Sequence, residues 1–156
     1  MKHVVESMEE LYKRQEPTGE AIVDAVVDVL RKFRLIYPED VALLLDVKVR
    51  DLRGAWLILT GMKLIDSITQ WRVMQAQDLI RKSLGEMGSD GRRAIDTTKL
   101  LRDVARCCGW RSERVMSHVF ERQLGCSVAV WLKKELKAPL VPPSRGRTCL
   151  SKHVGA

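Results

Sequence analysis

Residues 104–125 read VARCCGWRSERVMSHVFERQLG, a stretch that predicts two helices separated by a short turn. Gly109 can end the first helix, because glycine adopts the left-handed conformation freely. Ser112 is a good N-cap for the second helix. In that helix Met116 and Phe120 lie four residues apart, so they share one apolar face that points inward. The stretch therefore predicts a helix-turn-helix.

The same pattern occurs 63 to 64 residues earlier, where residues 41–61 read VALLLDVKVRDLRGAWLILTG. Asp46 stands where Gly109 stands in the later copy, and aspartate tolerates the left-handed conformation better than most residues. The other matches are a small residue, two apolar residues four apart and a terminal glycine: Ala42 with Ala105, Leu52 with Met116, Trp56 with Phe120, and Gly61 with Gly125. The sequence therefore predicts two helix-turn-helix units.

The rest of the chain is also predicted to be helical, so the expected fold class is all-α, with two helix-turn-helix subdomains joined by a long linker helix. Apolar residues recur at helical spacing over residues 23–30 and 64–79, and strand-like alternation is absent. We expect six segments in chain order: a helical N-terminal extension (1–19), the first unit (20–62), the linker helix (63–84), a flexible connection (85–96), the second unit (97–137) and a disordered basic tail (138–156).

The composition excludes several classes of protein. No apolar run approaches the ~20 residues of a membrane helix, and the N-terminus lacks the apolar stretch of a signal peptide. Four cysteines in 156 residues do not make a secreted disulfide framework and indicate reduced thiols. The adjacent Cys107 and Cys108 lack the spacing of a metal-binding loop, and the three histidines have no catalytic partner at a recognisable spacing. We expect no metal, no cofactor and no enzymatic activity.

The formal net charge of +7 points to a polyanionic partner. A basic domain of this size attracts polyanions, and nucleic acid is the commonest of them. The alternative is a basic surface that only keeps the protein in solution.

Taken together, these features resemble the AraC/XylS transcriptional regulators of bacteria, whose DNA-binding region has two helix-turn-helix units joined by a long linker helix. Residues 109–125 are similar to the family's signature in its second unit. In the linker, Arg72, Ala76 and Leu79 match the family's characteristic arginine, alanine and leucine. The resemblance runs from about Ile22 to Leu136. It implies a cytoplasmic, nucleoid-associated regulator that binds double-stranded DNA in a sequence-specific manner.

Four features depart from the family pattern, and one of them is the absence of the family's proline after the second glycine, where Ser127 and Val128 stand. Lys48 stands where the family prefers serine or threonine, so the first recognition helix has a weaker N-cap. Gly54 lies inside that helix, at a cost of ~1 kcal/mol relative to alanine. Gly54 either lets the backbone lie close to DNA or is a tolerated imperfection, and the second alternative is slightly favoured. The connection over residues 82–98 is about a dozen residues longer than the family's short turn, which can change the relative placement of the two units.

By this resemblance, the outward side chains of the second helix in each unit reach base edges. The predicted set in the first unit is Lys48, Val49, Arg50, Arg53 and Gly54, and the set in the second is Arg111, Ser112, Glu113, Arg114, Ser117 and His118. Arginine can donate to O6 and N7 of guanine, and glutamate can accept from N4 of cytosine. Arg111 suits contact with phosphate, which positions the protein without reading sequence. For any single residue, a solvated helix face is the alternative.

Two functions remain open at this point. The first is a transcriptional regulator that inserts both recognition helices into successive major-groove segments, with RNA polymerase or another transcription protein as a further partner and a monomer slightly favoured. The chain then resembles stand-alone family members without a sensing domain, although a fragment of a longer regulator is an alternative. The second function is a helical protein-interaction module with little DNA affinity, which Lys48, Gly54 and the long connection favour.

Overall fold

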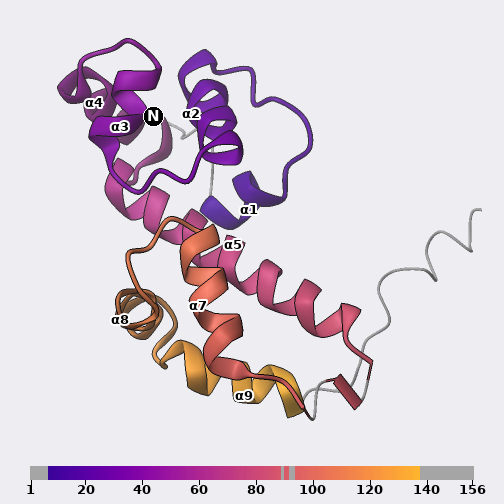
Figure 1. Cartoon of the computed structure of the whole chain (residues 1–156). Helices are drawn as coiled ribbons and strands as arrows, with labels where there is room; N and C mark the ends of the chain where they lie inside the picture. Colours follow the sequence, from indigo (N-terminus) through magenta and orange to yellow (C-terminus); the bar gives the residue numbers. More distant parts are fainter. Residues whose placement is uncertain (1–6, 89, 92–93, 138–156) are drawn as a thin grey trace, which may run out of the picture.

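The computed structural model describes residues 7–88, 90–91 and 94–137, and no strand is assigned among them. The fold is all-α, as predicted. Figure 1 labels the helices: α1 (Met8–Lys13), α2 (Ala21–Lys32), α3 (Pro38–Leu44), α4 (Val49–Thr60), α5 (Leu64–Glu86), α7 (Thr97–Cys107), α8 (Glu113–Leu124) and α9 (Val128–Lys137). The predicted tail over 138–156, residues 1–6 of the predicted extension, and positions 89, 92 and 93 of the connection lie outside the described residues.

The 23-residue helix α5 is the central element of the fold. Figure 1 shows it as a diagonal, with α2, α3 and α4 around its beginning, α7 and α9 below its second half, and α8 at the left, below its first half. Its first buried residues belong to the core of the first unit: Leu64, Ile68 and Trp71. Its later ones belong to the core of the second unit: Val73, Ala76, Ile80 and Leu84. One helix therefore carries both units and changes core between Trp71 and Val73.

The turns inside the two units have the same hydrogen bonds, which confirms the predicted repeat. In each turn an N–H donates to the carbonyl oxygen of the alanine five residues earlier: Val47 to Ala42 over 3.0 Å, and Trp110 to Ala105 over 2.9 Å. The residue before each donor is left-handed, with φ of 53° at Asp46 and 85° at Gly109. This is the Schellman motif, in which a left-handed residue satisfies the last carbonyl groups of a helix and reverses the chain.

The apolar stripes of α4 and α8 face inward, as predicted. All four predicted stripe residues are buried: Leu52, Trp56, Met116 and Phe120. Trp56 also joins α4 to α5, because its indole N–H donates to the hydroxyl of Ser67 over 2.9 Å. Both helices end at a left-handed glycine, with φ of 74° at Gly61 and 78° at Gly125. The opposite faces of α4 and α8 are thereby left for solvent or a partner.

Arg72 lies where α5 changes from one core to the other, and only 1% of its surface is exposed. Its guanidinium donates to three backbone carbonyl oxygens at the end of α2 and in the loop that follows: Leu30 over 2.9 Å, Phe33 over 2.5 Å and Leu35 over 2.9 Å. It also donates to Oε1 of Gln75 over 2.6 Å. The carbonyl end of a helix carries partial negative charge, so α2 offsets part of the buried positive charge. Burial lowers the pKa of Arg72, yet an arginine stays protonated inside a protein.

Helix α1, in the N-terminal extension, packs on both the first unit and the linker helix. Met8 and Leu11 belong to the core of the first unit. The Tyr12 hydroxyl donates to Oδ2 of Asp78 over 2.7 Å, and the Tyr12 ring packs edge-on against Trp71 with centroids 4.8 Å apart. The extension therefore contributes to the fold.

The two units also meet directly at Gly109. A Cβ atom at this position would collide with the backbone carbonyl oxygen of Arg34, in the loop after α2. Gly125 has a similar φ, but a Cβ there would meet no atom within 4 Å. Glycine is therefore required at 109 by both the backbone angle and the contact between units, and at 125 by the backbone angle alone.

This difference predicts unequal costs for two matched substitutions. Gly125→Ala should lower the free energy of unfolding by about 1–2 kcal/mol, the cost of a left-handed alanine. Gly109→Ala should cost roughly 1–3 kcal/mol more, because the Arg34 backbone must also move. Urea denaturation followed by circular dichroism measures both values. Equal costs would show that the units do not press together at Gly109.

Candidate nucleic-acid interface

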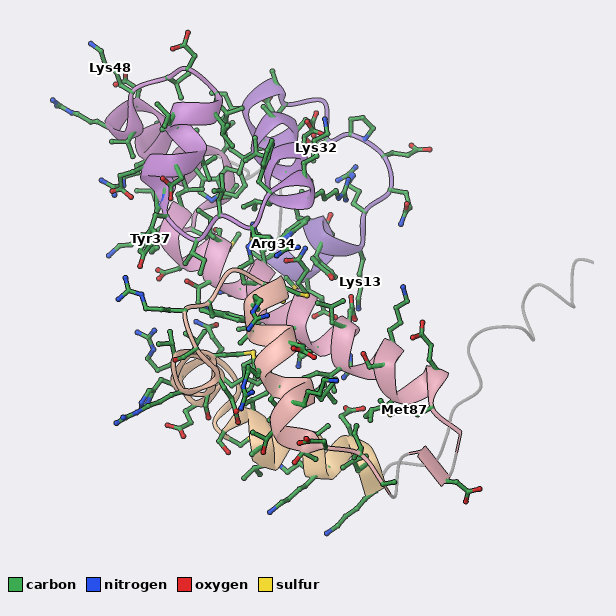
Figure 2. The ribbon with its side chains drawn as sticks, in the orientation of Figure 1. Lys13, Lys32, Arg34, Tyr37, Lys48 and Met87 are labelled. Carbon is green, nitrogen blue, oxygen red and sulfur yellow. The ribbon has the colours of Figure 1, made fainter. Side chains whose placement is uncertain are left out.

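The second helices of the two units, α4 and α8, lie on the same side of the molecule. In Figure 1 both are on the left, with α4 above and α8, viewed along its axis, below. Figure 2 shows Lys48 projecting outward next to the beginning of α4, and nitrogen-tipped side chains extending from α8 to the left. The predicted recognition helices therefore share one face.

The predicted residues of the second unit line the beginning of α8. Four of the six are exposed: Arg111, Ser112, Arg114 and His118. The other two, Glu113 and Ser117, are half-buried. The Ser112 hydroxyl accepts the N–H of Val115 over 3.2 Å, which confirms the predicted N-cap. Nδ1 of His118 lies 3.9 Å from the carboxylate of Glu121, one turn further along.

The predicted residues of the first unit are less uniform. Lys48, Arg50, Arg53 and Gly54 are exposed, whereas Val49 is half-buried and packs against the core of the first unit. Lys48 is the N-cap of α4 and its side chain makes no capping hydrogen bond, so the weaker cap predicted here is confirmed. A Cβ at Gly54 would meet no atom within 4 Å, so no contact within the described chain requires a glycine there.

Arg53 forms an ion pair with Glu39 at the beginning of α3. Both side chains are about half exposed, and such a pair contributes only about 0–1 kcal/mol to stability. The pairing nevertheless holds the Arg53 guanidinium against α3 and supplies a negative charge beside it. The first unit therefore presents Lys48 and Arg50 more openly than Arg53.

The repeat pairs each outward position of α4 with one of α8, 64 residues later. Arg50 corresponds to Arg114, so both helices carry an exposed arginine at the same position. Gly54 corresponds to His118, which lies opposite the buried stripe, at the centre of the outward face. The two faces therefore share one arginine, but α8 has a hydrogen-bonding side chain where α4 has none.

The comparison with known proteins bears on the fold. No protein-family model matches the chain, and no curated protein matches it in sequence. Among solved structures, the DNA-binding domain of AdpA, the global transcriptional factor, in complex with a target DNA, matches with a TM-score of 0.56 and 23% sequence identity. The match covers 74% of this chain and 93% of the AdpA chain. This chain therefore has the fold of that domain, two helix-turn-helix units joined by a long helix.

Sequence reasoning misses part of the outward faces of this tandem helix-turn-helix fold. One turn beyond the centre of each face, α4 exposes Leu57 (47%) and Ile58 (63%), and α8 exposes Glu121 and Arg122. A helical period of 3.6 residues applied along the full length of both helices would have found them. The pairing of Arg53 with Glu39 has no such signal, because it joins two helices.

Cys107 and Cys108 lie at the end of α7, before the turn that leads to α8. Cys107 is exposed and Cys108 is buried, and burial raises the pKa of the Cys108 thiol to about 12. Among the residues that the structure describes, no three histidine, cysteine or acidic side chains are grouped so as to hold a metal ion. None of the described helices is long and apolar enough to cross a membrane.

The geometry predicts different roles for Arg114 and Arg111. On a duplex that the protein selects from random DNA, Arg114→Ala should weaken binding by about 1–3 kcal/mol and relax the preference at one base pair, because a forked arginine–guanine contact is lost. Arg111→Ala should instead weaken binding equally on all sequences and reduce the salt slope by about one unit. Fluorescence anisotropy on the selected duplex, its single-base variants and random duplex separates the two patterns. A uniform loss for Arg114→Ala would contradict its base-reading role.

Proposed function

We propose that this protein is a sequence-specific transcriptional regulator that binds double-stranded DNA in the bacterial cytoplasm. It binds as a monomer, with α4 and α8 in successive major-groove segments on one face of the duplex. The two segments are then about 34 Å apart, one turn of the double helix.

The observation that carries this proposal is the matched pair of recognition helices on one face. Each unit repeats the same turn, and each second helix turns the same stripe inward. Each helix consequently exposes an arginine at the same position, Arg50 in α4 and Arg114 in α8. A duplex offers two equivalent major-groove segments on one face, and two equivalent helices match that symmetry.

The side chains on this face suit the major groove. Arg50 and Arg114 can each donate two hydrogen bonds to a guanine, Glu113 can accept from a cytosine, and Ser117 and His118 can bond to several bases. Lys48 and Arg111, beside the N-termini of the two helices, suit contact with phosphates. The net charge of +7 strengthens attraction to DNA without selecting a sequence.

The comparison supports the proposal at the level of the fold. The matched domain of AdpA was solved in complex with a target DNA, and AdpA is described as a global transcriptional factor. At 23% identity, the side chains that read sequence have to be argued from this chain alone.

A second candidate function is a protein-interaction module with little DNA affinity. Leu57 and Ile58 expose apolar surface in the second half of α4, and Arg53 is held by Glu39. An apolar face on the first recognition helix favours a protein partner over phosphates. In this candidate the first helix-turn-helix unit contacts another protein, whereas in the regulator it contacts DNA.

Selection from a random duplex library separates these functions. The regulator predicts an enriched motif with two parts about one helical turn apart. It also predicts an affinity whose logarithm falls linearly with the logarithm of salt concentration, with a slope of several units. No enrichment at low salt, together with a flat titration between about 50 and 200 mM salt, would favour the interaction module.

A further inference from the structure

A cleft of about 700 Å³ lies between the first unit and α8. One wall comes from Tyr37, at the beginning of α3, and from the first turns of α5, with Ile65 and Asp66. The other wall comes from α8 and the turn before it, with Arg111 and Arg122. The cleft therefore joins surfaces that are far apart in the sequence.

The cleft borders the face that carries the recognition helices. Val115 and Arg122 line it, and both are exposed residues of α8. Tyr37 is 61% exposed, and Figure 2 shows it on the left side of the molecule, between the first unit and α8. A duplex that contacts both α4 and α8 must therefore pass the opening of this cleft.

The cleft has the donors that a phosphate needs. Arg111 and Arg122 are exposed, and neither forms an ion pair with another described residue. Tyr37 also lines the cleft, and its side chain carries a hydroxyl donor. Guanidinium and hydroxyl groups are among the common donors to phosphate oxygens. Asp66, in the same wall as Tyr37, is the one carboxylate among the residues that line the cleft.

We infer that this cleft is a third DNA contact, in which Arg111, Arg122 and Tyr37 hold phosphates of the backbone segment between the two major-groove sites. The inference rests on the proposed function. When two recognition helices occupy successive major-groove segments, the backbone between those segments crosses the protein surface between the helices. Arg122 and Tyr37 are thereby added to the contact set, and they set affinity rather than sequence preference.

Asp66 provides a second test of the inference, because its negative charge repels a phosphate in the cleft. Over roughly 8 Å in water, removing one such repulsion should strengthen binding about twofold. The effect should be the same on every sequence, since all phosphates carry the same charge. A carboxylate at a surface that DNA does not approach would have no such effect.

The test compares four variants by anisotropy on a selected duplex and on random duplex. Arg122→Ala should lower affinity roughly fivefold to tenfold at about 0.1 M salt on both duplexes, and reduce the salt slope by about one unit. Asp66→Asn should raise affinity about twofold on both. Lys82→Ala and Glu86→Gln are the matched controls. These exposed residues lie 16 and 20 positions beyond Asp66 on α5, about 24 and 30 Å away, well beyond a Debye length of about 10 Å.

A modified duplex then tests where Arg122 acts. Uncharged methylphosphonates replace the phosphates between the two halves of the selected motif. The wild-type protein should lose affinity on this duplex. The loss for Arg122→Ala should be about fivefold smaller, because this variant lacks the guanidinium that contacts those phosphates. Equal losses for both proteins, or an Arg122→Ala variant that behaves like Lys82→Ala, would overturn the inference and leave the proposed function standing. Absence of DNA binding by the wild-type protein would overturn the proposed function itself.

Discussion

The contact between the Arg72 guanidinium and the end of α2 supports the arrangement of the whole molecule. A buried guanidinium needs acceptors for its donors, and three backbone carbonyl oxygens of the first unit supply most of them. The hydrogen bond to the Leu30 oxygen is buried, and that oxygen would cost roughly 1–3 kcal/mol if it lost its donor. Because Arg72 lies between the residues of α5 that serve the two cores, the contact holds the first unit at the point on α5 where the second unit begins.

The spacing of the recognition helices follows from that contact. The second unit packs on the later turns of the same helix, and Gly109 lets its turn press against the Arg34 backbone of the first unit. The two units are therefore held by a shared helix and by a direct contact. A protein that binds two major-groove segments at once needs such a fixed spacing, since every degree of freedom lost on binding would reduce its affinity.

The repeat in the sequence predicts much of the fold. The shared offsets indicate both turns, both buried stripes and both terminal glycines, because each depends on local backbone geometry. Contacts between elements that are distant in sequence have no such signal. The pairing of Arg53 with Glu39, the half-burial of Val49 and the cleft beside Arg122 are examples. The sequence marks Arg72 by resemblance alone; its carbonyl partners, 37 to 42 residues away, follow only from the packing of α5 on α2.

The measurement that tests the central claim most directly is hydroxyl-radical footprinting of the protein on a duplex that it has selected. The account predicts protected backbone on one face of the duplex, spanning two major-groove segments centred about 34 Å apart. A footprint confined to one segment would contradict the claim that both recognition helices bind DNA together. Protection around the whole circumference of the duplex would contradict binding by a single face.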